Sequence, residues 1–216
     1  MEKSRRNLLL LAVAAACFTA AVAPAAAHHD RFPGELAVLE FVQSIGWFGP
    51  IAHFFDVPVQ TWIIRILTGA GVAWSLWRRD LPHAGAFALL WPGYLLNSLV
   101  KTLVDRPRPE GDFDIAHVPS TAAFPSGHAF DAAAFSLIVA LAASREALPP
   151  AARRAIYAAG MATVILAAVS RVWLGLHWPS DVVAGSLLGA AYGALLWTIA
   201  GSLAGLPQLA RLQRAG

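Results

Sequence analysis

Long apolar segments recur along most of the chain and predict membrane-spanning helices. A helix needs about 20 apolar residues to cross roughly 30 Å of hydrocarbon, because it rises about 1.5 Å per residue. One such run, Leu8–Ala27, follows the basic opening MEKSRR. Further windows follow after residue 50, at Pro58–Trp77, Ala84–Val104, His128–Ala143, Ala155–Leu176 and Val182–Leu203. The pattern predicts an all-α, polytopic membrane helix bundle of five or six transmembrane helices.

The first apolar run has two interpretations, which divide the chain differently. A positive start, an apolar stretch and the small-residue segment APAAAHH resemble a secretory signal that is cleaved after Ala27, and an uncleaved first helix has the same pattern. Residues 1–27 are therefore either a signal peptide or a first transmembrane helix. Residues 28–216 are predicted to form one membrane-embedded domain, and the polar motifs considered below fall in residues 101–181.

The segment GELAVLEFVQSIGWFGPIAHFF mixes apolar and polar positions at helical spacing. Glu35, Glu40 and Gln43 interrupt its apolar residues, and a Gly-Pro pair is expected to stop the helix. This pattern is typical of an amphipathic helix that lies in the membrane interface. We predict such a helix at the outer surface.

Composition supports the bilayer as the solvent of this chain. Residues of the set AVILMFWYC make up 57% and DEKR only 13%, against roughly 45–50% apolar and about 25% charged residues in soluble proteins. A length of 216 residues suits one domain.

The distribution of basic residues predicts the orientation of the helices. The isoelectric point of about 9.5 would also suit a nucleic-acid-binding protein. However, most basic groups fall in KSRR, WRRD, SREALPPAARR and ARLQR, which alternate with the predicted spans as cytoplasmic loops do. This pattern needs no nucleic-acid partner, and it places three polar connections on the outer face: residues 28–57, 105–127 and 177–181.

The first outer cluster, KTLVDRPRP, carries Lys101, Arg106 and Arg108. Pro107 and Pro109 push the arginines that precede them toward extended conformations, so both guanidinium groups are presented from a stiff loop. Planar guanidinium groups match phosphate oxygens, and lysine adds a point charge. Taken alone, the cluster also fits a basic edge that binds lipid headgroups.

The second cluster, FPSGHAFDAAAF, places Ser126, Gly127 and His128 where a helix begins. Serine can cap the helix, and glycine leaves room for a ligand to approach the free N–H groups that bind phosphate at a helix N-terminus. His128 is placed to deliver a proton. A single histidine here would otherwise be a capping or interfacial residue.

The third cluster, SRVWLGLHWPSD, contains Arg171, His177 and Asp181. A carboxylate that accepts a hydrogen bond from one imidazole nitrogen fixes the tautomer and leaves the other nitrogen free to attack. One His-Asp pair at a helix junction is often structural. Three such clusters on one face are harder to explain without a phosphate site.

We expect no metal ion or other cofactor in this site. His128 and His177 lack the close spacing of zinc ligands, and the surrounding cations would repel a divalent ion.

The last apolar window carries a stripe of small residues at four-residue spacing, Gly185, Gly189 and Gly193. Such a stripe lets helices approach closely. It predicts either packing within the bundle or the contact face of a homodimer.

The spacing of the polar residues resembles the three-part signature of the type 2 phosphatidic acid phosphatase superfamily. The matching residues are Lys101, six residues and Arg108-Pro109; Pro125-Ser126-Gly127-His128; and Ser170-Arg171, five residues, His177, three residues and Asp181. No signature position departs from the pattern.

The resemblance implies a role for each matching residue. His177 would attack phosphorus to form a phosphohistidine, Asp181 would orient it, and His128 would protonate the leaving oxygen and later help water to hydrolyse the intermediate. The phosphoryl oxygens would be held by Lys101, Arg108, Ser126, Gly127 and Arg171. Arg106 lies outside the signature and is a possible additional phosphate ligand.

The apolar windows favour the integral-membrane lipid phosphatases of this superfamily. The expected substrate is a lipid phosphate or diphosphate of the undecaprenyl diphosphate, phosphatidate or phosphatidylglycerophosphate type. We expect a bacterial inner (plasma) membrane protein whose active site faces the periplasm or cell exterior. The alternatives are a lipid phosphotransferase that uses the same phosphohistidine, and a non-catalytic lipid-phosphate binding or transport protein.

Overall fold

The computed structural model describes residues 2–28, 31–55, 57–109 and 120–206, and all regular elements within these ranges are helices. Among the described residues, five helical segments are long and apolar enough to cross a membrane: Arg5–His28, Leu81–Val104, Gly127–Arg145, Pro150–Trp173 and Pro179–Ala204. The shorter apolar helix Trp62–Trp77 lies beside them. The predicted all-α polytopic bundle is confirmed.

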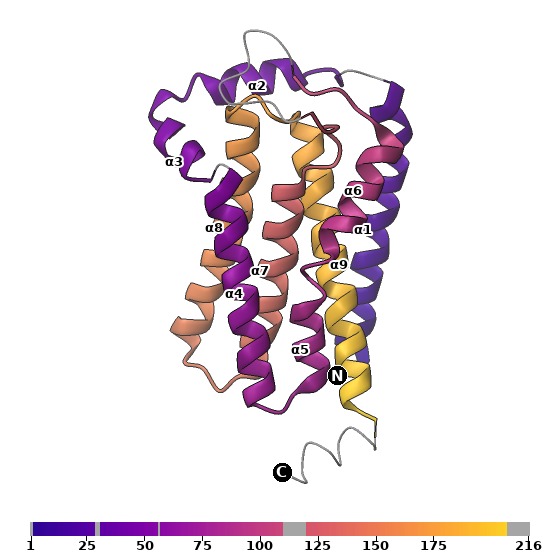
Figure 1. Cartoon of the computed structure of the whole chain (residues 1–216), viewed down its shortest axis with the longest axis vertical. Helices are drawn as coiled ribbons and strands as arrows, with labels where there is room; N and C mark the ends of the chain where they lie inside the picture. Colours follow the sequence, from indigo (N-terminus) through magenta and orange to yellow (C-terminus); the bar gives the residue numbers. More distant parts are fainter. Residues whose placement is uncertain (1, 29–30, 56, 110–119, 207–216) are drawn as a thin grey trace.

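The long helices run along the long axis of the molecule, and the short outer helices cross one end of it (Figure 1). The helices of the bundle itself are α1 (Glu2–His28), α4 (Val57–Trp77), α5 (Leu81–Ala88), α6 (Gly93–Val104), α7 (Gly127–Arg145), α8 (Pro150–Trp173) and α9 (Pro179–Ala204), where α5 and α6 together span the length of one long helix. The outer set consists of α2 (Glu35–Gln43), the 3₁₀ turn η1 (Gly46–Phe48) and α3 (Gly49–Phe54).

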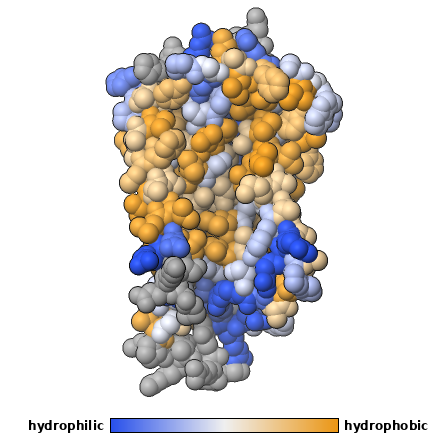
Figure 2. Space-filling view, turned by 180° about the vertical axis from the view of Figure 1, so that it is seen from behind, coloured by the Kyte–Doolittle hydropathy of each residue, from blue (hydrophilic) through white to orange (hydrophobic). Residues whose placement is uncertain are grey.

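Large apolar side chains cover the sides of the bundle. Leu11, Ile66, Leu103 and Met161 come from four different helices and are each more than 60% exposed. Figure 2 shows apolar residues gathered around the middle of the molecule, with polar residues toward both ends. Such a surface is stable in lipid, and this protein is an integral membrane protein.

The predicted window Ala84–Val104 is divided into two helices in the structure. Helix α5 ends at Ala88 and α6 begins at Gly93, with Pro92 between them. Proline cannot donate a backbone hydrogen bond, which favours a break at this position. The hydroxyl of Tyr192 donates to the carbonyl of Leu89 at 2.7 Å, so this carbonyl keeps a partner.

Helices α7 and α9 pack with their backbones in close approach. A methyl group added at Gly185, Gly189 or Gly193 would collide with the α7 side, at the backbone of Ser126, Phe130 and Ala134 respectively. The small-residue stripe is therefore buried inside the bundle. This is the first of the two predicted arrangements, and α7 of the same chain occupies the face that a homodimer through this stripe would need.

The outer segment contains the predicted amphipathic helix, but its boundaries differ from the prediction. Helix α2 ends at Gln43, and the Gly49-Pro50 pair begins α3 instead of stopping a helix. Proline is favoured in the first turn of a helix, where its missing N–H would have no intrahelical acceptor. The segment thus turns across the end of the bundle instead of forming one straight helix.

The N-terminal apolar run forms helix α1, which packs against α9. Ala12 lies in a small apolar cluster with Ala191 and Ala194. Cleavage after Ala27 stays a prediction.

Candidate functional site

All three polar clusters lie at the end of the bundle that α2 and α3 cover (Figure 1). Lys101 is in the last turn of α6, and Arg106 and Arg108 follow in the loop. Ser126 is the N-cap residue of α7, which begins at Gly127 and His128. Arg171 is in the last turn of α8, His177 lies in the short connection, and Asp181 is in the first turn of α9.

His177 lies at the centre of this group, with 3% of its surface exposed. Its Nε2 atom is 3.1 Å from Nη1 of Arg108, and its Nδ1 atom is 3.6 Å from Oδ2 of Asp181. Arginine can only donate, so Nε2 accepts and the ring proton belongs on Nδ1, facing the carboxylate. The distance of 3.6 Å between Nδ1 and Oδ2 is longer than a hydrogen bond, so Asp181 lies close to the imidazole without a hydrogen bond to it in this structure.

The environment of His177 favours the uncharged form of its imidazole. Burial, together with the positive charges of Arg108, Lys101 and Arg171, lowers the pKa of His177 well below its ordinary value, and the carbonyl of Ala123 opposes this shift. With its proton on Nδ1, the neutral imidazole has a lone pair on Nε2, as a nucleophile requires.

Asp181 is held at both of its oxygens. Oδ1 accepts from Nη1 of Arg106 at 2.6 Å, and Oδ2 accepts from the backbone N–H of Trp178 at 2.8 Å. The second bond closes the first turn of α9, where a carboxylate also interacts favourably with the helix dipole. The oxygen that faces His177 is thus placed by the start of the helix itself.

Arg106 does not lie where the sequence analysis expected a possible phosphate ligand. Its side chain is fully buried. Nη1 donates to Oγ of Ser180 at 2.7 Å and to Asp181, and Nη2 donates to Oε2 of Glu35 at 2.6 Å. The guanidinium group is occupied by two carboxylates, because two buried acids on neighbouring elements need a shared cation.

Lys101 and Arg108 connect the loops that surround His177. Nζ of Lys101 donates to the carbonyls of Ala122 and Ala123 at 2.5 and 3.2 Å. Arg108 donates through Nε to the carbonyl of Thr121 at 2.8 Å and through Nη1 to that of Leu176 at 2.6 Å. These bonds hold both cations beside the histidine.

The PSGH segment differs in one respect from the predicted anion nest. The backbone N–H of Ser126 donates to the carbonyl of Asp181 at 2.9 Å, so this N–H is already engaged. The Oγ atom of Ser126 is buried and has no hydrogen-bond partner among the described residues. The hydroxyl of Ser126, unlike its backbone N–H, is therefore available for a hydrogen bond.

Arg171 and His128 complete the predicted set. Arg171 is 1% exposed and donates through Nη2 to the carbonyl of Phe55, at the end of α3, at 2.5 Å. Its charge is close enough to lower the pKa of His177. His128 is half-buried in the first turn of α7.

Glu35 was not predicted as a site residue. The sequence pattern presented it as a polar interruption of an interfacial helix, yet it is 6% exposed and pairs with Arg106. The sequence offered one signal for such an acid, namely Arg106, which lies beside the signature and needs a partner. It did not indicate which acidic residue would pair with Arg106.

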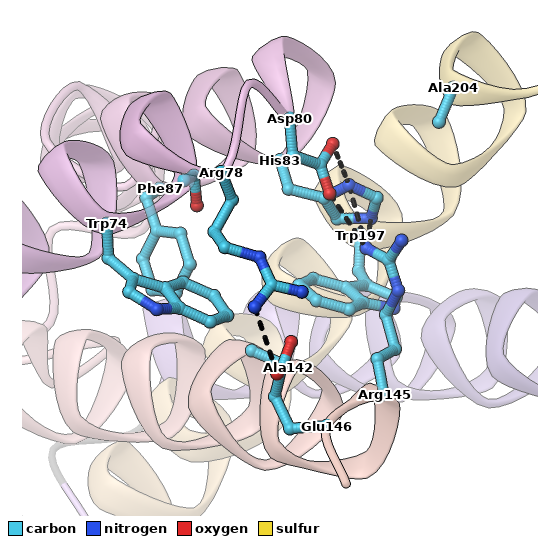
Figure 3. A pocket seen from close by; sticks show the side chains of 11 residues that line it. Trp74, Arg78, Asp80, His83, Phe87, Ala142, Arg145, Glu146, Trp197 and Ala204 are labelled. Carbon is cyan, nitrogen blue, oxygen red and sulfur yellow. Dashed lines mark hydrogen bonds and ion pairs between the residues drawn. The ribbon is translucent and has the colours of Figure 1, made fainter. Parts of the chain in front are cut away.

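A separate polar pocket of about 340 Å³ lies at the opposite end of the bundle and contains none of the predicted site residues. Figure 3 shows Arg145 directed at the pair of His83 and Asp80. Nδ1 of His83 is 2.7 Å from Oδ1 of Asp80, and Nη1 of Arg145 is 3.2 Å from Oδ2 of Asp80. The charges of this pocket are largely paired, in contrast to the excess of cations around His177.

The sequence of this chain is similar to those of named bacterial phosphatases. The chain is 34% identical to the decaprenylphosphoryl-5-phosphoribose phosphatase of Mycobacterium tuberculosis over 183 residues, which cover 80% of this chain and 94% of the relative. It is also 34% identical to phosphatidylglycerophosphatase B of Bacillus subtilis over 97 residues, which cover 44% of this chain and 46% of that protein.

The fold has a counterpart among solved structures. A crystal structure of a transmembrane PAP2-type phosphatidylglycerolphosphate phosphatase from Bacillus subtilis superposes with a TM-score of 0.55 at 25% sequence identity, over 88% of this chain and 90% of that one. Residues 82–203, which include all three clusters, match the model of the PAP2 superfamily. This chain therefore belongs to the PAP2 superfamily and is a phosphatase.

Proposed function

We propose that this protein hydrolyses a lipid phosphate at the outer face of the membrane through a phosphohistidine intermediate. One observation carries the proposal: His177 is buried between Asp181 and a group of cations, where a neutral imidazole is favoured. A binding protein would gain from the cations but would need neither a neutral nucleophile nor a carboxylate that orients it.

The proposed reaction has two displacement steps at phosphorus. Nε2 of His177 attacks, the P–N bond forms, and the bond from phosphorus to the lipid oxygen breaks while His128 donates a proton to that oxygen. Water then attacks the phosphohistidine with His128 as the base, the P–N bond breaks, and inorganic phosphate leaves. Lys101, Arg108 and Arg171 stabilise the charge on the phosphoryl oxygens in both steps.

The position of the site indicates the substrate class. The site lies at one end of an apolar bundle, so a headgroup phosphate bound there would leave the lipid chain in the bilayer. The relative from Mycobacterium tuberculosis, whose match covers 80% of this chain, is named for a polyprenyl-linked sugar phosphate. Polyprenyl-linked phosphates, including undecaprenyl diphosphate, are therefore our first candidates, followed by phosphatidylglycerophosphate and phosphatidate.

We propose a location in a bacterial inner membrane, and the charge distribution supports a site that faces away from the cytoplasm. Arg78 follows α4, Arg145 ends α7 and Arg153 lies in the first turn of α8, all at the end of the bundle opposite His177. Basic residues are enriched on the cytoplasmic side of membrane proteins. The site would then face the periplasm or cell exterior.

Phosphate release by the detergent-purified protein in EDTA tests the proposal. We expect inorganic phosphate from at least one of decaprenylphosphoryl-5-phosphoribose, undecaprenyl diphosphate, phosphatidylglycerophosphate and phosphatidate, and none from a His177→Ala control. Activity that disappears in EDTA would contradict the metal-independent mechanism. Label that moves from the substrate to an added lipid or sugar, with no free phosphate, would identify a phosphotransferase.

The acidic limb of the pH–rate profile is expected to move to higher pH in an Arg108→Gln variant. Because the pKa of His177 is lowered, the imidazole stays neutral even at a pH below the ordinary pKa of histidine. Because removing the charge of Arg108 raises that pKa, the nucleophile should become protonated at a higher pH. Profiles of kcat/KM are compared for the wild type and the variant on the same substrate, so the ionisation of the substrate affects both equally. Acidic limbs at the same pH would contradict the assignment of this limb to His177.

A further inference from the structure

The outer helix α2 reaches the catalytic centre through Glu35. Oε2 of Glu35 accepts from Nη2 of Arg106 at 2.6 Å, and Nη1 of Arg106 donates to Oδ1 of Asp181 at 2.6 Å. The other oxygen of Glu35, Oε1, accepts from both the backbone N–H and the hydroxyl of Ser180, at 2.9 and 2.6 Å. Glu35 thus contacts both the arginine and the first turn of α9.

Burial makes the two ion pairs depend on each other. The side chains of Arg106 and Asp181 are fully buried, and that of Glu35 is 6% exposed. A buried arginine between two carboxylates is fixed by both, and losing one partner leaves an uncompensated charge. The ring of Phe32 lies 5.0 Å from the guanidinium carbon and limits movement on that side.

We propose that Glu35 and Arg106 are positioning residues for the reaction at His177. Glu35 fixes the guanidinium group of Arg106, and Arg106 holds Oδ1 of Asp181 so that Oδ2 remains directed at Nδ1 of His177. The inference rests on the proposed phosphatase function, and it makes an outer interfacial helix part of the catalytic framework. Both side chains are bound by groups of the protein itself, so in this proposal neither is a substrate ligand.

The packing of α2 fits this role. Leu39 is fully buried in a cluster with Val172, Trp178 and Val182, whereas Phe41 on the same helix is 67% exposed. The buried side of α2 is thus attached to the segment that carries His177 and Asp181. Because α2 lies across the ends of α8 and α9, its position determines where the carboxylate of Glu35 is held.

A Glu35→Gln variant tests the proposal, with Glu40→Gln as the matched control. Glu40 is exposed on the same helix. Glutamine keeps the shape of Glu35 but removes the charge that fixes Arg106. We expect kcat on the preferred lipid phosphate to fall about 10- to 100-fold with KM changed less than about threefold, as for other residues that orient a reactive group. Glu40→Gln should match the wild type.

A double-mutant cycle separates positioning from simple destabilisation. If Glu35 acts through Arg106, the fold-loss of kcat in Glu35→Gln/Arg106→Gln should be smaller than the product of the two single fold-losses. Both substitutions interrupt the same chain of contacts to Asp181, so the second adds little to the first. Thermal unfolding of each purified variant shows that the assayed protein is folded at the assay temperature. Additive losses, or a wild-type kcat in folded Glu35→Gln, would overturn the proposal.

If Glu35→Gln does not fold, a second variant, Arg106→Lys, tests the proposal. Arg106→Lys keeps the buried positive charge, but one ammonium group cannot form the two-sided contact to both carboxylates. We expect the same selective loss of kcat, and a wild-type kcat would overturn the inference. If the wild-type protein released no phosphate from any lipid, the proposed function would fail instead, so the two failures are distinguishable.

Discussion

Replacing His177 with alanine is expected to lower the rate of phosphate release by at least about 10³-fold, because the substitution removes the atom that forms the intermediate. The cations would still hold the substrate, so its binding should weaken much less than its turnover. Nε2 of His177 is 3.1 Å from Nη1 of Arg108, where an incoming phosphoryl group would meet both the nucleophile and a positive charge.

The control for this substitution is His53→Ala. His53 is an exposed histidine on α3, at the same end of the bundle. It should leave the rate near that of the wild type. Rapid quenching with labelled substrate should trap a phosphoprotein that is stable to alkali and labile to acid in the wild type, and none in His177→Ala. A labelled protein of the same stability in the alanine variant would exclude His177 as the nucleophile.

Replacing Gly189 with alanine is expected to destabilise the protein strongly. The added methyl carbon would lie 2.8 Å from both the carbonyl carbon and the Cα atom of Phe130, and closer still to its oxygen. These are backbone atoms of α7, so no side-chain rotation relieves the contact, and the two helices must separate. Overpacking costs about 1–3 kcal/mol or more. The separation would also move His128, which α7 carries, away from Asp181 on α9.

A matched glycine on another helix provides the control. An added methyl group at Gly85 in α5 would meet no atom within 4 Å. Alanine there should be neutral or stabilise the helix by about 0.5–1 kcal/mol. Thermal unfolding in detergent and phosphate release should be measured for both Gly189→Ala and Gly85→Ala. Equal melting temperatures would show that α7 and α9 are not packed as closely as the structure indicates.

The local features of this protein are largely evident from its sequence. Apolar windows such as Val182–Leu203 indicate where the helices cross the bilayer, because a backbone in hydrocarbon must satisfy its own hydrogen bonds. The alternation of basic loops with these windows places His128, His177 and Asp181 at one end. Chain direction reverses with each crossing, so side chains far apart in the sequence could be assigned to one face without a structure.

Partner choice among charged groups required the tertiary structure. Arg106 and Arg108 are two residues apart in the same proline-rich segment, yet Arg106 pairs with two carboxylates and Arg108 faces His177. The family signature distinguishes Arg108 from Arg106, but the sequence does not indicate which groups Arg106 contacts. The outcome depends on Glu35, which lies 71 residues away from Arg106 and reaches it only because α2 folds across the end of the bundle.

The glycine stripe shows the same division between local pattern and tertiary contact. Its spacing indicated that some helix would approach α9 closely, and the structure decided that this helix is α7 of the same chain. Hydrophobicity and helical periodicity are properties of short segments and can be read along the chain. Ion pairs and close backbone contacts depend on where distant segments meet, and only the packed bundle determines that.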